Sequence, residues 1–293
     1  MAIRQITIIG TGLIGGSFAL ALKKRRFPGS IIGCDRPPIL ARAQQIGAID
    51  QADSNPLEAS RASQVVVLAT PVGAIMDLIR SLGPTLPPKT LLTDVGSTKS
   101  EILACARQVF GSGLRRRFLA GHPMAGKEQS GLESADPDLF RGAAWFITPT
   151  AGQKIFEGLS GEFLEYVEKT GARIVSMSGD AHDRFCAWSS HLPQMISTAL
   201  AAALVDEYGD GAPLLDIAGR GLRDMTRLSV SPYSMWRDVA LTNKKNLQQT
   251  LWKLEQRLAH VRENLDNREL AAEFEQAHKL HNAAKSKRRR RRQ

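Results

Sequence analysis

The sequence has few cysteines, and their spacing gives them no common role. Cys34, Cys105 and Cys186 are odd in number, lie far apart and belong to no CxxC pair. A disulfide framework and a cysteine-based metal or redox site are therefore not expected. Unpaired thiols are typical of a reducing compartment, so we expect a cytoplasmic protein.

Long apolar runs are also missing. The best candidates, residues 65–68 and 199–205, fall far short of the ~18 residues that a membrane helix needs. The first strand-like run is not preceded by the charged region, apolar region and cleavage site of a secretory signal. We expect neither membrane association nor secretion.

Two motifs of hydrolytic sites are absent as well. The chain contains neither HExxH nor GxSxG, and the pair His278 and His281 has no evident third ligand. The sequence therefore predicts no metal site and no Ser/His/Asp hydrolase.

Acidic residues are absent from the C-terminal end, where basic residues gather. Of the net charge of +10, seven positive charges come from Lys285, Lys287 and residues 288–292. We expect residues 285–293 to form a solvated, disordered basic tail. The rest of the chain does not have the basicity of a nucleic-acid-binding protein, and attachment of the tail to an anionic partner is the alternative.

What is present is the composition of an ordinary globular protein, with 293 residues, 43% hydrophobic and 23% charged. Up to about residue 150, short β-branched runs alternate with helix-like windows, as in β-α units around a parallel sheet. The predicted strands are residues 6–9, 30–34, 65–69, 90–93, 118–120 and 145–148, with a further strand at 173–177. Beyond it nearly everything has helical period, so we predict domains 1–178 and 179–284.

Several local signals describe the helices. Pro37 can open a helix, Thr98 and Glu101 match a capping box, and Pro193 should kink a long helix. One late helix carries an apolar stripe, which fits packing within the chain and pairing between subunits equally well. Its members are Leu247, Leu251, Leu254, Leu258, Val261 and Leu265.

A GxGxxG motif follows the first predicted strand. Gly10 permits a tight turn, Gly12 lets the backbone approach a pyrophosphate, and Gly15 allows close helix packing. Asp35 ends the second strand, where a carboxylate can accept hydrogen bonds from a ribose. The predicted dinucleotide contacts are Gly10, Gly12, Leu13, Ile14, Gly15, Asp35, Arg36, Thr70 and Pro71.

The same region bears on the choice of dinucleotide. The Asp35 carboxylate would repel a 2′-phosphate, which favours NAD over NADP. The Arg36 guanidinium could instead pair with that phosphate, so NADP stays open.

Candidate catalytic residues follow two other strands. Ser97 lies after residues 90–93, where it can cap a helix or face the nicotinamide and substrate. His122 follows residues 118–120, between a glycine and a proline. A neutral histidine there can accept a proton from a substrate hydroxyl as hydride leaves, although a satisfied loop histidine fits the pattern equally.

The helical part holds two further groups of polar residues. His182-Asp183 precedes the sequence SHLP, in which His191 reads more readily as structural than as catalytic. Arg223 and Arg227 lie one helical turn apart and could bind a carboxylate, or form a solvated basic face.

Taken together, these motifs resemble the prephenate/arogenate (cyclohexadienyl) dehydrogenase family of tyrosine biosynthesis. The resemblance covers residues 4–282 and is carried by GTGLIGGS, ATPV, DVGSTK, GHPMAGKEQSG, HD, SHLP and GRGLRDMTR in this order. It implies a Rossmann-type N-terminal domain, an all-helical C-terminal dimerisation domain as in 6-phosphogluconate dehydrogenases, and a homodimer.

The resemblance also implies roles for single residues. His122 matches the histidine that hydrogen-bonds the ring hydroxyl and promotes hydride transfer. Ser97 matches the serine that orients that histidine, the hydroxyl and the nicotinamide. His191 matches a substrate-cleft histidine, and Arg227 matches the arginine that binds a substrate carboxylate. Glu128 matches a cleft acid, to which we assign gating or orientation.

The expected reaction is the NAD-dependent oxidative decarboxylation of prephenate to 4-hydroxyphenylpyruvate, with arogenate to tyrosine as the alternative. Tyrosine is a possible inhibitor at the active site, and no fused mutase or regulatory domain is expected. Two rival readings are another hydroxyacid dehydrogenase, whose lysine base is not found near residues 219–227, and an NAD-sensing regulator with a nucleic-acid-binding tail.

Overall fold

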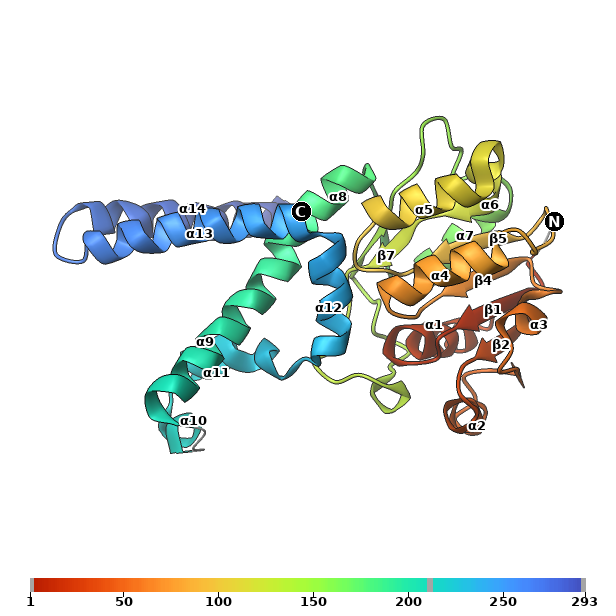
Figure 1. The fold of residues 1–293 in the computed structure, drawn as a ribbon, viewed down its shortest axis with the longest axis horizontal. Coiled ribbons are helices and arrows are strands. Elements are labelled where there is room, and N and C mark those ends of the chain that lie inside the picture. Colours follow the sequence, from red (N-terminus) through yellow and green to blue (C-terminus); the bar gives the residue numbers. More distant parts are fainter. Residues whose placement is uncertain (1–2, 210–212, 291–293) are drawn as a thin grey trace. The chain divides into compact units, whose positions relative to one another are not determined.

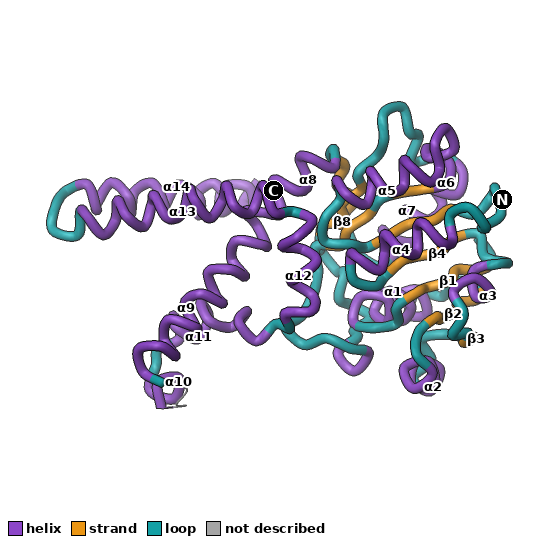
Figure 2. The backbone as a smooth tube through the Cα atoms, viewed as in Figure 1, coloured by secondary structure: helices purple, strands orange, loops and turns teal. Residues whose placement is uncertain are grey.

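A parallel sheet of six strands organises the N-terminal part of the chain in this computed structural model, which describes residues 3–209 and 213–290 (Figures 1 and 2). The strand order is β3-β2-β1-β4-β5-β6. This is the doubly wound Rossmann order, in which ligands bind at the carboxyl edge between the first and fourth strands. The strands are β1 Gln5–Ile9, β2 Ser30–Cys34, β3 Gln51–Ala52, β4 Val65–Leu68, β5 Leu91–Asp94 and β6 Phe118–Leu119.

Both faces of this sheet are covered, which is why its inner strands are apolar throughout. In β4, Val65 and Val67 belong to one buried cluster, whereas Val66 and Leu68 belong to the other. The first cluster packs under α1 Leu13–Lys24, α2 Pro37–Gln45 and α7 Gly158–Lys169. The second packs under α3 Pro56–Ser60, α4 Val72–Leu82, α5 Ser100–Phe110 and α6 Leu114–Arg117. As expected, Pro37 is the first residue of α2.

A second sheet of three strands differs from the single sheet that the sequence predicts. Its order is β7-β8-β9, with β7 Gly121–Pro123 antiparallel to β8 Ala144–Ile147 and β8 parallel to β9 Arg173–Ser176. The predicted strand at 145–148 therefore exists, but it pairs with the segment that carries His122. Trp145 anchors this sheet because its ring packs against Phe18 of α1.

The helical part of the first compact unit, Met1–Lys244, begins with α8 Gly179–Cys186. The irregularity expected near Pro193 takes the form of a π-helical turn at Ala187–His191, directly before α9 Leu192–Tyr208. Such turns are frequent at functional sites. The elements that follow are α10 Pro213–Ile217, α11 Arg220–Thr226, the 3-10 turn η4 Arg227–Val230 and α12 Tyr233–Thr242.

The second compact unit, Lys245–Gln293, is a helical hairpin. Its helices are α13 Lys244–Glu263 and α14 Glu269–Arg290, which lie antiparallel (Figure 1) and are joined by the Arg257–Glu273 ion pair. Helix α14 continues to Arg290, whereas the sequence predicts a disordered tail from residue 285, and residues 291–293 lie outside the described part. Among the described residues, no helix is long and apolar enough to cross a membrane.

Candidate functional site

The turn between β1 and α1 shows why each glycine of the GxGxxG motif stands where it does. Gly10 has φ +93°, and a Cβ atom there would lie 2.6 Å from the Ala69 carbonyl oxygen. A Cβ at Gly15 would collide with the carbonyl oxygen of Gly10. A Cβ at Gly12, in contrast, would meet no protein atom within 4 Å. The backbone at Gly12 is therefore open to a ligand, beside a helix start that no side chain caps.

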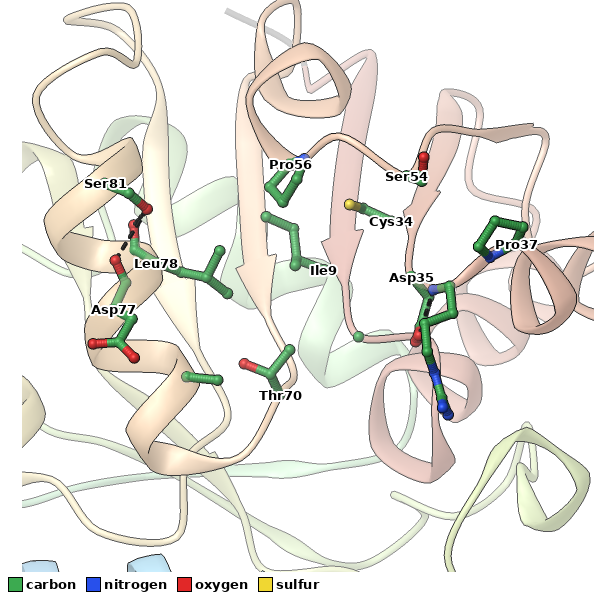
Figure 3. A pocket seen from close by; sticks show the side chains of 13 residues that line it. Ile9, Cys34, Asp35, Pro37, Ser54, Pro56, Thr70, Asp77, Leu78 and Ser81 are labelled. Atoms are coloured by element: carbon green, nitrogen blue, oxygen red, sulfur yellow. Dashed lines mark hydrogen bonds between the residues drawn. The ribbon is translucent and has the colours of Figure 1, made fainter.

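A cavity of about 640 Å³ lies beside this turn, at the carboxyl edge of β1 and β2 and against α4 (Figure 3). That volume is in the range of small-molecule sites. Its lining includes four of the nine predicted dinucleotide contacts: Gly10, Asp35, Arg36 and Thr70. Pro71 lies directly before α4, and Leu13 and Ile14 form the half-buried start of α1.

Asp35 connects the cavity wall to the glycine turn. Its Oδ2 accepts hydrogen bonds from the Thr11 backbone N–H at 2.8 Å and from the Thr11 hydroxyl at 3.2 Å. Its Oδ1 accepts a bond from the Arg36 backbone N–H at 2.8 Å. The carboxylate thus places a fixed negative charge in the cavity, where it favours hydroxyl donors over a phosphate.

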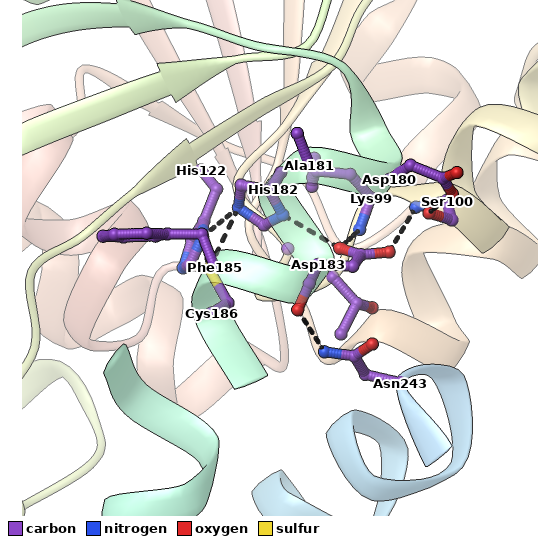
Figure 4. A network of polar contacts seen from close by, with 12 residues as sticks. Lys99, Ser100, His122, Asp180, Ala181, His182, Asp183, Phe185, Cys186 and Asn243 are labelled. Carbon is purple, nitrogen blue, oxygen red and sulfur yellow. Dashed lines mark hydrogen bonds and ion pairs between the residues drawn. The ribbon is translucent and has the colours of Figure 1, made fainter. Parts of the chain in front are cut away.

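His122 is the centre of a second group of polar residues (Figure 4). The sequence places it in a loop, but the structure places it in β7, where it pairs with Phe146 of β8 and is buried. Its Nδ1 lies 2.8 Å from Nε2 of His182 on α8. Nδ1 of His182 in turn lies 2.9 Å from Oδ1 of Asp183. A chain of three side chains therefore leads from β7 into α8.

Asp183 is fixed by the start of α5. Its Oδ1 accepts the Lys99 backbone N–H at 2.7 Å, and its Oδ2 accepts the Ser100 backbone N–H at 2.8 Å. The capping box predicted at Thr98 is therefore wrong: α5 has no cap from its own segment, and Asp183 supplies one from another helix. The Thr98 hydroxyl instead lies 2.7 Å from the Thr242 hydroxyl of α12.

A fully buried ion pair lies under this group. Lys99 Nζ pairs with Asp94 at the end of β5 and donates to the Gly121 carbonyl oxygen at 2.7 Å. Asp94 also accepts the backbone N–H groups of Gly96 at 2.9 Å and Gly121 at 3.2 Å. The end of β5 is thus tied to the strand that carries His122. Sequence reasoning quoted Lys99 within a motif but gave it no role.

Burial sets the protonation of the site histidines. It lowers the pKa of His122 well below the usual 6.5, with further lowering by the charges of His182, Lys99 and His191. Burial also lowers the pKa of His182, although Asp183 opposes this effect. Both rings are therefore neutral at neutral pH, as proton acceptors must be.

His191 lies at the end of the π-helical turn and is buried. Its Nδ1 lies 3.1 Å from the Asn243 amide nitrogen, and its ring packs edge-on against Trp236. Burial lowers its pKa to about 4. Within the described part of the chain, its Nε2 is buried without a hydrogen-bond partner. A ligand group that forms a hydrogen bond would satisfy such a buried polar atom.

Two other predicted residues meet each other. Arg227, the first residue of η4, forms an ion pair with Glu128 of the segment after β7, and both side chains are partly exposed. The Arg223 guanidinium donates to the Asp216 carbonyl oxygen at 3.1 Å.

Ser97 is half-buried between β5 and α5. Among the side-chain hydrogen bonds of residues 3–209 and 213–290, those of His122 run to His182 and Cys186 and not to Ser97. The role of Ser97 stays a prediction, with its place beside the Asp94–Lys99 pair as its structural setting.

Three atoms of metal-ligating type lie within 4.8 Å of one another in the described structure, on His122, His182 and Cys186. Sequence spacing gave no sign of this group, because His122 lies 60 residues before His182. The hydrogen bond between the two rings accounts for their approach, and burial raises the pKa of the Cys186 thiol to about 12. Such a thiol keeps its proton at neutral pH when no metal ion is bound.

Comparison with known proteins agrees with this architecture. Residues 18–176 match the family described as prephenate dehydrogenase, nucleotide-binding domain, and residues 178–279 match prephenate dehydrogenase, dimerization domain. The curated prephenate dehydrogenases of Lactococcus lactis and Bacillus subtilis are 34% and 36% identical over 82% and 83% of this chain. The chain spans 65% of the length of each of these relatives.

A solved structure is similar along nearly the whole chain. Prephenate dehydrogenase from Aquifex aeolicus, in complex with hydroxyphenyl propionate and NAD+, has a TM-score of 0.82 and 29% identity. The match covers 98% of each chain. The arogenate dehydrogenase of Synechocystis has a TM-score of 0.71 and 28% identity, over 97% of this chain and 98% of the other.

Proposed function

Because this chain belongs to the prephenate dehydrogenase family, we propose that it catalyses the NAD-dependent oxidative decarboxylation of prephenate to 4-hydroxyphenylpyruvate. The observation that carries the proposal is a neutral, buried histidine on β7 in the same unit as an open glycine turn. The Aquifex relative, solved with NAD+ and a hydroxyphenyl acid, supports both ligand classes.

The residues of the glycine turn and cavity fit a dinucleotide. No side chain covers the backbone at Gly12, and the start of α1 has no side-chain cap, so its backbone N–H groups can bind an anion. The Asp35 carboxylate can accept hydrogen bonds from a ribose. When bound, the nicotinamide supplies the acceptor for the hydride that leaves C4 of the substrate ring. The Asp35 charge supports NAD as the cofactor.

The chain's own residues position the substrate and move its proton. His122 accepts the proton of the ring hydroxyl, and Ser97 orients that hydroxyl. Arg227 holds a substrate carboxylate, and the unsatisfied Nε2 of His191 contributes a further polar contact. The C1 carboxylate leaves as CO₂ as the ring becomes aromatic, so the protein mainly orients groups and stabilises charge.

The test is turnover by the purified full chain, followed by the absorbance of NADH or NADPH. Prephenate and arogenate are each combined with NAD⁺ and NADP⁺. We expect turnover with prephenate and NAD⁺. Turnover with arogenate alone would replace the substrate, and no turnover in any combination by a folded, NAD⁺-binding protein would overturn the proposal.

Assembly and regulation follow from the same family. We propose a cytoplasmic homodimer with domains at 1–178 and 179–284, supported by the match of residues 178–279 to a dimerization domain. The hairpin exposes Leu258, Phe274 and Leu280, and such apolar groups suit a subunit interface. Tyrosine shares the phenol ring of the product, so we expect it to compete with the substrate for the same site.

Replacing Asp35 by asparagine is expected to weaken the preference for NAD⁺. Loss of a charge-assisted hydrogen bond to the ribose raises the KM for NAD⁺ about tenfold, while the KM for NADP⁺ rises less because the repulsion is also gone. Steady-state kinetics with both cofactors measure the effect. Asp53→Asn is the control, because the Asp53 carboxylate accepts the Asn55 backbone N–H and neither residue lines the cavity. An unchanged ratio of the KM values for NAD⁺ and NADP⁺ would show that Asp35 does not contact the ribose of the cofactor.

Replacing Arg227 by alanine is expected to raise the KM for prephenate about 10- to 100-fold, because one charge-assisted pair with a carboxylate is lost. The kcat should change far less, since a carboxylate remote from C4 is bound equally before and during reaction. Arg61→Ala removes the exposed Arg61–Glu58 ion pair and serves as the matched control. A fall in kcat with unchanged KM would contradict a binding role.

A further inference from the structure

The chain His122–His182–Asp183 has a direction that the hydrogen bonds themselves determine. The Asp183 carboxylate already accepts two backbone N–H groups, at the start of α5. Burial raises the pKa of this carboxyl, but the hydrogen bonds from His182, Ser100 and Lys99 outweigh burial and keep that pKa below its usual value. An ionised carboxylate can only accept hydrogen bonds. The nitrogen that faces it, His182 Nδ1, must therefore carry a proton.

The next link follows from the chemistry of neutral imidazole. A neutral ring has one N–H donor and one acceptor, so a protonated Nδ1 on His182 leaves its Nε2 as an acceptor. That Nε2 lies 2.8 Å from Nδ1 of His122, which must then donate. His122 is thereby held as the Nδ1–H tautomer, with the lone pair on Nε2. The opposite arrangement would set the lone pair of His182 Nδ1 against the Asp183 carboxylate at 2.9 Å.

We propose that His182 is a positioning residue which, with Asp183, fixes the tautomer of His122 so that its Nε2 is the nitrogen that accepts the substrate proton. This inference rests on the proposed function of His122. It adds to that function the identity of the basic nitrogen and the residues that select it. Figure 4 shows the three side chains in line, with dashed contacts from His122 through His182 to Asp183.

The surrounding groups are compatible with this direction. The Cys186 sulfur lies 3.4 Å from His182 Nε2 and 4.0 Å from His122 Nδ1. A thiol is a weak hydrogen-bond donor. The lone pair on His182 Nε2 therefore accepts the shorter hydrogen bond from the His122 N–H and not one from the thiol. Lys99, paired with Asp94, adds a positive charge that disfavours protonation of either ring.

Asp183→Asn is the sharpest test, because it removes the charge that requires a proton on His182 Nδ1. An amide that places its NH₂ at the position of Oδ1 donates to His182 Nδ1 and reverses both links, with loss of the hydrogen bond from the Lys99 backbone N–H. In that orientation His122 carries its proton on Nε2. In serine proteases, the corresponding Asp→Asn change in the catalytic triad leaves the geometry intact and produces the wrong histidine tautomer. We expect kcat to fall at least about 10²-fold with little change in KM.

The tautomer itself is measured by long-range ¹H–¹⁵N correlation spectra of the full chain labelled with ¹⁵N-histidine. The chain has six histidines, and spectra of His122→Asn and His182→Gln assign the two signals. We expect the Nδ1–H form of His122 in the unsubstituted protein and the Nε2–H form in Asp183→Asn. A His122 signal of the Nε2–H form in the unsubstituted protein would overturn the inference without any variant.

Substitution of His182 adds a rescue test. His182→Leu cannot accept from His122, and its kcat should fall as in Asp183→Asn. The side chain of a glutamine can donate to Asp183 and accept from His122, so His182→Gln should recover at least about tenfold of that loss. Arg184→Ala, an exposed residue on the same helix, is the control. A kcat of His182→Leu within threefold of the unsubstituted protein would contradict the proposal.

Failure of the inference is separable from failure of the proposed function. If His122→Asn is inactive while Asp183→Asn and His182→Leu turn over normally, His122 stays the base and the relay is wrong. If His122→Asn itself turns over normally, the base assignment fails, and the spectra alone then decide whether the relay sets the tautomer.

Discussion

His122→Asn is expected to lower kcat by about 10²- to 10⁴-fold, the usual contribution of a general base. Asparagine is polar and compact, so it can still donate to His182 across the position of the 2.8 Å contact. It cannot accept a proton at neutral pH, and the ring hydroxyl then loses its proton only to water. The measurement is steady-state turnover with saturating prephenate and NAD⁺, together with circular dichroism to confirm folding.

The pH dependence of the unsubstituted protein follows from the same residue. Because burial holds the pKa of His122 well below 6.5, the ring is a free base at neutral pH and remains so as the pH falls through 6.5. The acid limb of kcat/KM should therefore lie below pH 6.5 and should disappear from the residual activity of His122→Asn.

His260→Asn is the control, since that histidine lies on α13 with a partly exposed side chain. Turnover of His122→Asn within threefold of the unsubstituted protein would show that another group accepts the proton. An acid limb above pH 6.5 would contradict the effect that we assign to burial.

Lys99→Met is expected to cost about 3–5 kcal/mol in the free energy of unfolding, the effect of breaking a buried ion pair. The substitution leaves the fully buried Asp94 carboxylate without its cation and the Gly121 carbonyl oxygen without a donor. Methionine fills a similar volume, so the loss reports on charge rather than on a cavity. Urea unfolding at neutral pH gives the free energy and the midpoint.

The exposed pair Lys23–Asp50 provides a matched comparison. Lys23→Met should cost no more than about 1 kcal/mol, because solvent screens a surface ion pair. Adding Asp94→Asn to Lys99→Met should recover part of the loss, since the orphaned charge is then gone while the amide oxygen still accepts a backbone N–H of Gly96 or Gly121. Equal costs at the two lysines would show that burial does not strengthen the Asp94–Lys99 pair.

The glycine turn could be predicted from the sequence because its requirements are local. The requirement for glycine at positions 10, 12 and 15 comes from backbone geometry within a few residues. The structure confirms the turn at Gly10 and the close packing at Gly15. Pro37 is similar, since a proline at the start of a helix needs no distant partner. The Rossmann-type sheet followed for the same reason, from apolar strands at regular spacing.

The parts that could not be predicted depend on distant partners. β3, Gln51–Ala52, is short and exposed, so it carries no apolar pattern. The segment after β6 joins a second sheet because it meets β8, which the residues of β7 do not reveal. The cap of α5 comes from Asp183, 84 residues after Lys99. The histidine chain likewise joins residues 60 positions apart, and the adjacent pair His182-Asp183 is the part of it that the sequence shows directly.

The Asp183 carboxylate both caps α5 and ends the histidine chain. The amide protons of Lys99 and Ser100 are donated to the same carboxylate that ends the histidine chain. Their exchange with deuterium requires those hydrogen bonds to open, by motion of either the backbone or the carboxylate. The exchange rate of these two amides therefore reports how often the start of α5 loses its hydrogen bonds to Asp183. This measurement needs no substrate, cofactor or substitution.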